Sequence, residues 1–125
     1  MRKIIKTNES PKAIGSYSQG IIHNGLVFTS GQICINPKTG KLVNDSFKDE
    51  VRQVLENLKG VVTHGGSNLE KIAKLTVFIT DLSLFSELND VFNEYFRENP
   101  PARSTIEVSA LPMDVRVEIE AIGII

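Results

Sequence analysis

Arg103 is the second residue of a short β-type run, and its residue type and setting suit chemistry. In an extended strand it would share a face with Thr105 and Glu107. It follows the stiff segment 100–102 (Pro-Pro-Ala), so its side chain would start from a fixed backbone. Such a guanidinium suits a bidentate grip on a small carboxylate. The alternative is a solvent-exposed face on which cross-strand ion pairs contribute little to stability.

A second group of charges lies near the C-terminus. Alternation along segment 115–124 places Arg116, Glu118 and Glu120 on one face of a strand. These residues could also form an ordinary solvent-exposed face, because opposite charges on such a strand form ion pairs that contribute little to stability.

Small residues around one aromatic and one glycine form two further candidates. Tyr17 stands in "GSYSQG" (15–20), which is either an ordinary entry loop or a pocket wall that carries a phenol and hydroxyls. In "TSGQ" (29–32), Ser30 precedes Gly31, whose missing side chain would let a backbone N–H approach a ligand. As neighbours in a strand, Ser30 and Gly31 would point to opposite faces.

The remaining reactive side chains favour structural roles. Cys34 has no partnered histidine in a recognisable arrangement, so we expect a small core residue rather than a nucleophile. His23 and His64 lie far apart in the sequence without the spacing of metal ligands. The sequence therefore predicts no metal site.

Apolar patterns predict the strands that must position these groups. Asn24-Gly25 lies between two apolar runs and predicts a hairpin, because both residues tolerate positive φ. In the fourth run, Ala73 and Leu75 are expected to face the same way. Strands are expected at 3–6, 19–23, 26–32, 71–80, 102–108 and 115–124.

A first helix is expected over residues 47–62, where apolar residues recur at helical spacing. Ser46 and Asp49 resemble a capping box at its start, with Asp in place of Glu. Gly65-Gly66 would end it.

A second helix is expected over residues 85–96, capped by Asp81 or Ser83 and ended by Pro100-Pro101. The order is β-β-β-α-β-α-β-β, and two helices with one apolar stripe each can cover only one face of the sheet. In segment 26–32 neither alternating set is wholly polar. The sequence therefore predicts that the second face is buried against other copies of the chain.

Composition places this chain among ordinary globular proteins. Its 125 residues form one expected domain, residues 1–125, with 41% hydrophobic and 23% charged residues. A net charge of −1 and the lack of a basic stripe disfavour a dedicated nucleic-acid binder. One cysteine, a polar beginning and no long apolar run predict a cytoplasmic protein without a membrane partner.

Taken together, five segments closely resemble the Rid family, the RidA/YjgF type of reactive-intermediate (enamine/imine) deaminase. The resemblance runs essentially end to end, and its C-terminal motif is the most specific part. The segments are "AIGSYSQG" (13–20), "VFTSGQI" (27–33), "NPKTGKL" (36–42), "TVFITDL" (76–82) and "PPARSTIEVSALPMDVRVEIEAI" (100–122).

The resemblance implies an α+β fold like that of bacterial chorismate mutase, with a mixed sheet and two helices on one face. It implies a homotrimeric barrel with three equivalent sites in clefts between subunits. It also assigns roles: Arg103 binds a substrate carboxylate and Glu118 positions the attacking water. Thr105 stands where many relatives have cysteine, and the family uses this position largely through its backbone N–H. The implied substrate-binding residues are Tyr17, Ser30, Gly31, Asn89, Arg103 and Thr105.

The implied reaction converts reactive 2-imino acids to 2-oxo acids and ammonia. Its substrates would be 2-iminopropanoate and 2-iminobutanoate, which arise from the enamines 2-aminoacrylate and 2-aminocrotonate. Free imines already hydrolyse in water, so positioning and one acid/base group suffice, and no cofactor is expected. The alternative is a non-catalytic or regulatory protein that binds small carboxylates through the same arginine and does not need Glu118.

Overall fold

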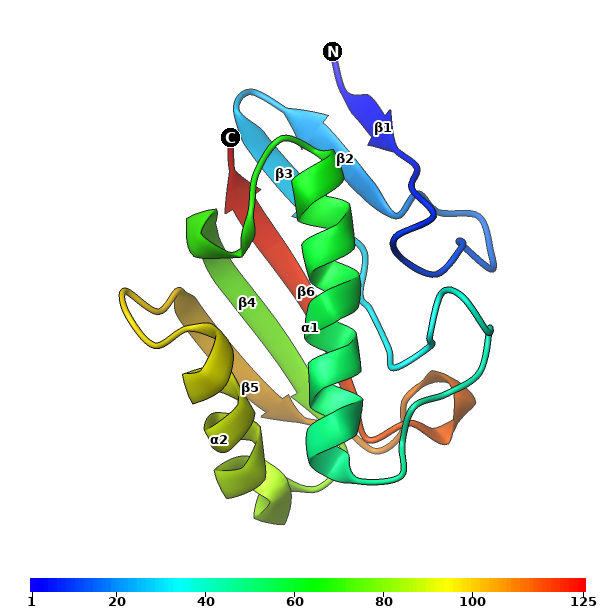
Figure 1. Ribbon diagram of the computed structural model, residues 1–125, viewed down its shortest axis with the longest axis vertical. Helices are drawn as coiled ribbons and strands as arrows, with labels where there is room; N and C mark the ends of the chain where they lie inside the picture. The colour runs from blue at the N-terminus through cyan, green and yellow to red at the C-terminus, as the bar shows by residue number, and fades with distance from the viewer.

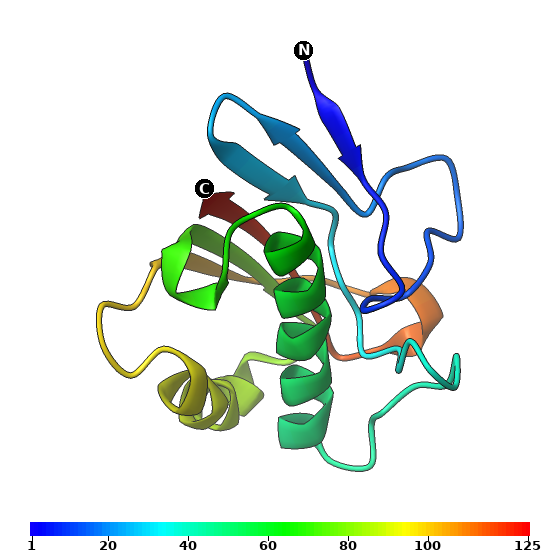
Figure 2. The ribbon, with the colours of Figure 1, turned by 45° about the horizontal axis from the view of Figure 1, so that its top comes forward.

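The computed structural model describes residues 1–125 as a six-stranded mixed sheet with both helices on one side (Figures 1 and 2). Its order is β1-β2-β3-β6-β4-β5, and only β4 and β5 pair in parallel. The predicted β-β-β-α-β-α-β-β order is confirmed. The elements are β1 (Lys3–Ile5), β2 (Gly20–His23), β3 (Leu26–Thr29), α1 (Phe47–His64), β4 (Ile72–Ile79), α2 (Phe85–Tyr95), β5 (Ala102–Glu107) and β6 (Val117–Ile124).

Local signals in the sequence set most of the element ends. Asn24 and Gly25 have φ of 49° and 75°, as the tight turn between β2 and β3 requires. The Ser46 hydroxyl caps α1 by accepting from the Asp49 N–H. The Asp49 carboxylate bonds Arg52, so only half of the predicted capping box forms.

The start of α2 differs from the prediction. Asp81 accepts from the Ser83 N–H and caps a short 3-10 turn, Leu82–Leu84, that precedes the helix. The helix itself begins at Phe85 behind Leu84, which offers no side-chain cap. The turn already satisfies backbone groups that a capping side chain would otherwise serve.

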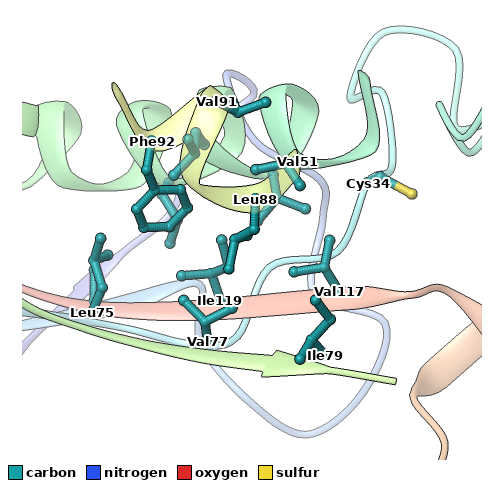
Figure 3. Close-up of a cluster of buried hydrophobic side chains, with 14 of the residues drawn as sticks. Cys34, Val51, Leu75, Val77, Ile79, Leu88, Val91, Phe92, Val117 and Ile119 are labelled. Atoms are coloured by element: carbon teal, nitrogen blue, oxygen red, sulfur yellow. The ribbon is translucent and has the colours of Figure 1, made fainter. Parts of the chain in front are cut away.

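The main core lies between the two helices and the sheet (Figure 3). β4 and β6 supply its floor through residues such as Leu75 and Ile119, and α2 supplies Leu88 from above, all fully buried. Cys34 is also buried without exposed area, as predicted. Burial raises the pKa of its thiol to about 11, so it is a protonated packing residue.

A bulge in β4 contradicts the prediction that Ala73 and Leu75 face the same way. The pairing of β4 with β6 shifts register between Ile72 and Lys74. Ile72 is therefore buried, whereas Ala73 is exposed and does not share the core face with Leu75. An extra residue in one strand interrupts the alternation of side chains.

The position of Arg116 also differs from the prediction, because it does not share a strand face with Glu118. It precedes β6, and its Nε donates to Oε1 of Glu50 on α1 at 2.8 Å. Glu50 is fully buried and also accepts from the N–H groups of Arg116 and Val117 at 2.7 and 3.1 Å. A buried carboxylate needs such partners, so α1 draws the arginine away from the sheet.

The sheet face opposite the helices carries a row of apolar side chains. Register places Ile4, Ile21, Phe28 and Ile122 side by side on four neighbouring strands. Ile4 is 64% exposed and Phe28 is 39% exposed. We call these four residues the apolar row, and its predicted burial against other copies stays a prediction. No helix of the fold has both the length and the apolarity to cross a bilayer.

Candidate functional site

Arg103 lies on the helix-covered face of the sheet, on the edge strand β5. It is in register with Leu75, which is buried beneath the helices. Its Cζ lies 5.4 Å from the ring centroid of Phe85 and 5.0 Å from that of Phe92, both on α2. Two aromatic rings thus hold the guanidinium by cation–π contacts. Burial lowers the pKa of Arg103 from its ordinary value, but a guanidinium stays charged in proteins.

Around Arg103 lies a cavity of about 210 Å³ between α2 and β5. Asn89 lines it from the helix, and Pro100 and Pro101 line it where the chain enters the strand. Thr105 follows two residues along β5 and therefore faces the same side as Arg103. The Thr105 Oγ1 is buried and has no hydrogen-bond partner. This region thus combines the positive charge of Arg103 with a polar group that has no hydrogen-bond partner, the Thr105 hydroxyl.

Glu118 lies on the opposite face of the sheet, in β6. It is in register with Phe78, and its neighbours Val117 and Ile119 point into the core. Burial raises the pKa of the Glu118 carboxyl, and the nearby Glu120 raises it further. No cation forms a salt bridge with it. A carboxyl of this kind is suited to exchange protons with a bound water.

A second cavity, of about 350 Å³, contains Glu118 together with Tyr17, Ser30 and Gly31. Because β3 ends at Thr29, Ser30 and Gly31 lie outside the strand in which their alternation was expected, and both line this cavity. The Ser30 Oγ donates to the Ser18 carbonyl at 2.5 Å and is fixed in place. Tyr17 is 48% exposed at the cavity rim.

Gly31 has a steric reason to be glycine that the sequence did not reveal. A Cβ at this position would lie 2.1 Å from the Glu118 Oε2 and 2.8 Å from its Cδ. The carboxylate therefore occupies the space of the missing side chain. Any larger residue at position 31 would displace Glu118.

The seven predicted site residues thus form two separate half-sites. We call Arg103, Asn89 and Thr105 the arginine half-site, and Tyr17, Ser30, Gly31 and Glu118 the glutamate half-site. Strand β4 separates β5 from β6, and the two half-sites lie on opposite faces of the sheet. The residues of one half-site therefore do not meet those of the other within one chain. Their roles stay predictions.

Sequence reasoning missed several residues that shape the two half-sites. Phe85 and Phe92 were counted only as part of the helix stripe, although their spacing of seven places them on one helix face. Lys12, in a loop, and Pro112, at the start of the short 3-10 turn Pro112–Asp114, also line the cavity of the glutamate half-site. No periodic pattern marks loop residues, so no signal in the sequence identified them. No cluster of three His, Cys, Asp or Glu side chains is arranged to hold a metal ion.

Comparisons with known proteins identify a family model and many relatives that match this chain. The profile of a family described as endoribonuclease L-PSP matches residues 7–125. A RutC family protein of Pyrococcus horikoshii is 48% identical over 123 residues, which cover 98% of each chain. The chloroplastic Reactive Intermediate Deaminase A of Arabidopsis thaliana is 38% identical over 122 residues, which cover 98% of this chain and 65% of the relative.

Solved structures confirm the fold. YyfA of Yersinia pestis, described as a Rid family protein, matches with a TM-score of 0.96 and 46% identity over all of both chains. Escherichia coli TdcF, solved with bound serine, matches with a TM-score of 0.94 and 44% identity over 98% of each chain. The predicted two-helix, mixed-sheet architecture is therefore that of its structural relatives.

Proposed function

Because the chain belongs to the Rid family, we propose that it is a reactive intermediate deaminase that hydrolyses 2-imino acids to 2-oxo acids and ammonia. The observation that carries this proposal is the division of the site into two half-sites. One offers a held guanidinium for a carboxylate, and the other offers a carboxyl with a raised pKa for a water. These are the two functions that imine hydrolysis needs.

We propose that a homotrimer joins the two half-sites. Since one face carries Arg103 and the other carries Glu118, a head-to-tail ring would set the arginine half-site of each subunit against the glutamate half-site of the next. Three equivalent sites would result. The apolar row supports association, because an exposed apolar face of this kind is favourably covered by another chain.

In the proposed mechanism, Arg103 holds the substrate carboxylate in two parallel hydrogen bonds, and the backbone N–H groups of Gly31 and Thr105 assist. The imine carbon then lies beside a water held by Glu118. The water oxygen bonds to this carbon as the second bond of the C=N group opens, and Glu118 accepts a proton from the water and passes it to the nitrogen. The C–N bond of the resulting carbinolamine then breaks as Glu118 moves the hydroxyl proton to the departing nitrogen, which leaves ammonia and the carbonyl of the 2-oxo acid.

The proposed substrates are small, namely 2-iminopropanoate and 2-iminobutanoate. The two cavities of about 210 and 350 Å³ fit compounds of three or four carbons with room for a water. The relative TdcF was solved with serine, a three-carbon amino acid with a carboxylate. Tyr17 would close the site at its rim, and Ser30 and Asn89 would order the ligand and the water.

A mixing experiment tests the division of the site between subunits. Arg103→Ala and Glu118→Gln are purified separately and each is expected to be inactive. They are then unfolded together in equal amounts and refolded, and ammonia release is measured with 2-iminobutanoate generated by an amino-acid oxidase. In a randomly mixed ring, about one quarter of the interfaces combine an intact Arg103 with an intact Glu118. Activity should therefore return to about a quarter of the wild-type value.

The controls separate the alternatives. Each variant refolded alone should remain inactive, and sedimentation equilibrium should show three copies of the 13.8 kDa chain in every sample. No recovery in mixed trimers would refute the shared site. A non-catalytic carboxylate binder would bind 2-oxo acids through Arg103 and show no turnover even as the wild type.

A further inference from the structure

The glutamate half-site is built largely from irregular chain, and something must hold its walls in place. One wall is formed by residues 11–17 and the other by residues 30–35. Neither belongs to a helix or a strand, and the second has only isolated bridges to its neighbours. The two walls are tied down by buried polar side chains that lie outside the cavity.

Gln19 holds the first wall. Its side chain is 4% exposed and uses both ends of its amide. The oxygen accepts from the Thr7 N–H at 2.7 Å, and the nitrogen donates to the carbonyls of Thr7, Ser10 and Pro11 at 3.0, 3.2 and 2.8 Å. Pro11 lines the cavity, so this one amide fixes the path of the chain into the wall.

Asn57 holds the second wall from α1. It is fully buried, and its Nδ2 donates to the carbonyls of Ile33 and Ile35 at 3.0 and 2.8 Å. Both isoleucines line the cavity. The two carbonyls set the orientation of the amide, and its Oδ1 also accepts from Gln53 on the same helix at 2.9 Å.

Ser10 joins the two anchors. Its hydroxyl, 1% exposed, donates to the backbone carbonyl of Asn57, while its own carbonyl accepts from Gln19. Both walls are therefore connected by hydrogen bonds to the same residue of α1, Asn57. Between them, Gln32 exchanges backbone hydrogen bonds with Ile119, the residue after Glu118.

We propose that Ser10, Gln19 and Asn57, here called the amide network, are positioning residues for the glutamate half-site. None of them lines its cavity. The network acts by fixing the walls that carry Tyr17, Ser30 and Gly31 relative to Glu118. This inference rests on the proposed function, but its effect on the walls can be measured without any turnover.

The first test uses Gln19→Glu. The introduced carboxylate would keep the acceptor toward Thr7 but face three carbonyl oxygens, and protonation would restore one donor. We expect kcat to fall at least about tenfold at neutral pH, because a wall displaced by an ångström misaligns the reacting groups. Binding of 2-oxobutanoate, which depends on Arg103, should change little. The defect relative to wild type should shrink as the pH is lowered.

Ser10→Ala is the second variant, because it removes one bond and leaves the rest of the network intact. Gln53→Ala is the matched control, since it loses the bond to Asn57 but none of the bonds to the walls. We expect Ser10→Ala to lower kcat with little change in 2-oxobutanoate affinity, and Gln53→Ala to match wild type. Circular dichroism should confirm that each variant is folded.

A readout without substrate uses Tyr17, since the chain has two tyrosines and no tryptophan. In a Tyr95→Phe background, Tyr17 emission reports on the first wall alone. Gln19→Glu should lower its anisotropy and increase its quenching by acrylamide. Unchanged Tyr17 emission and unchanged kcat in a folded Gln19→Glu protein would overturn the proposal. Wild-type protein that does not hydrolyse imines would refute the proposed function, and Tyr17 emission would still decide whether the network holds the wall.

Discussion

Gly31→Ala is the most direct probe of the glutamate half-site, because the structure gives the size of the disturbance. The new methyl group would lie 2.1 Å from the Glu118 Oε2, whereas ordinary contact begins near 3.4 Å. The carboxylate must therefore retreat by about 1.3 Å. A misplacement of about 1 Å costs a catalytic step on the order of 100-fold, so we expect kcat for 2-iminobutanoate to fall by about this factor.

Stability should be nearly unaffected by Gly31→Ala. The clash is with the end of a flexible side chain, and Gly31 does not have a positive φ. We expect the free energy of unfolding in urea to change by no more than about 1 kcal/mol. Affinity for 2-oxobutanoate, measured by calorimetry, should stay within a few-fold, because Arg103 is on the other half-site.

Gly15→Ala is the matched control for this experiment. It lies in the same loop as Tyr17, and a Cβ there would make only ordinary contact, at 3.5 Å from the Tyr17 ring. It should retain wild-type kcat. The reasoning fails if Gly31→Ala keeps wild-type kcat although a crystal structure shows the Glu118 carboxylate displaced.

Four further predictions concern single side chains of the two half-sites. Arg103→Lys should raise KM at least about tenfold in steady-state assays, because lysine keeps the charge but loses the planar fork; an unchanged KM would contradict the bidentate grip. Phe92→Leu removes one of the two rings over this guanidinium and should weaken 2-oxobutanoate binding by calorimetry, with an expected loss of about 0.5–1 kcal/mol. Thr105→Val removes a buried hydroxyl without a partner and should raise the free energy of unfolding by about 1 kcal/mol; a loss of that size would show that the hydroxyl is bonded. Glu118→Gln should be more stable than wild type above the raised pKa of Glu118, where the folded protein must keep a charged carboxylate partly buried. Since the folded state binds the proton more tightly than the unfolded state, this advantage should shrink as the pH falls through the folded pKa in urea titrations.

Local sequence rules predicted the parts of the fold that depend on neighbours along the chain. The hairpin at Asn24-Gly25 and the end of α1 at Gly65-Gly66 follow from backbone conformations that glycine and asparagine permit. The helices were predicted because their apolar stripes repeat over several turns. Ala73 was misplaced because a bulge depends on the partner strand, and nothing in β4 alone announces it.

The site was predicted only as a set of residues. Alternation relates side chains within a strand, but it does not say whether Arg103 on β5 and Glu118 on β6 face the same way. That relation depends on strand register, which long-range pairing sets. Arg116 was misplaced for a similar reason, because its partner Glu50 lies 66 residues earlier in the chain.

The apolar row also affects whether a newly folded monomer associates correctly or aggregates. A monomer displays Ile4, Ile21, Phe28 and Ile122 on an uncovered sheet, next to the unpaired edge of β1. Exposed strands with apolar side chains are prone to aggregation. Correct association and precipitation therefore compete for the same surface during refolding. The yield of refolded protein should fall as apolar exposure lasts longer, and a charged substitution on the row, such as Phe28→Lys, should keep the monomer dispersed.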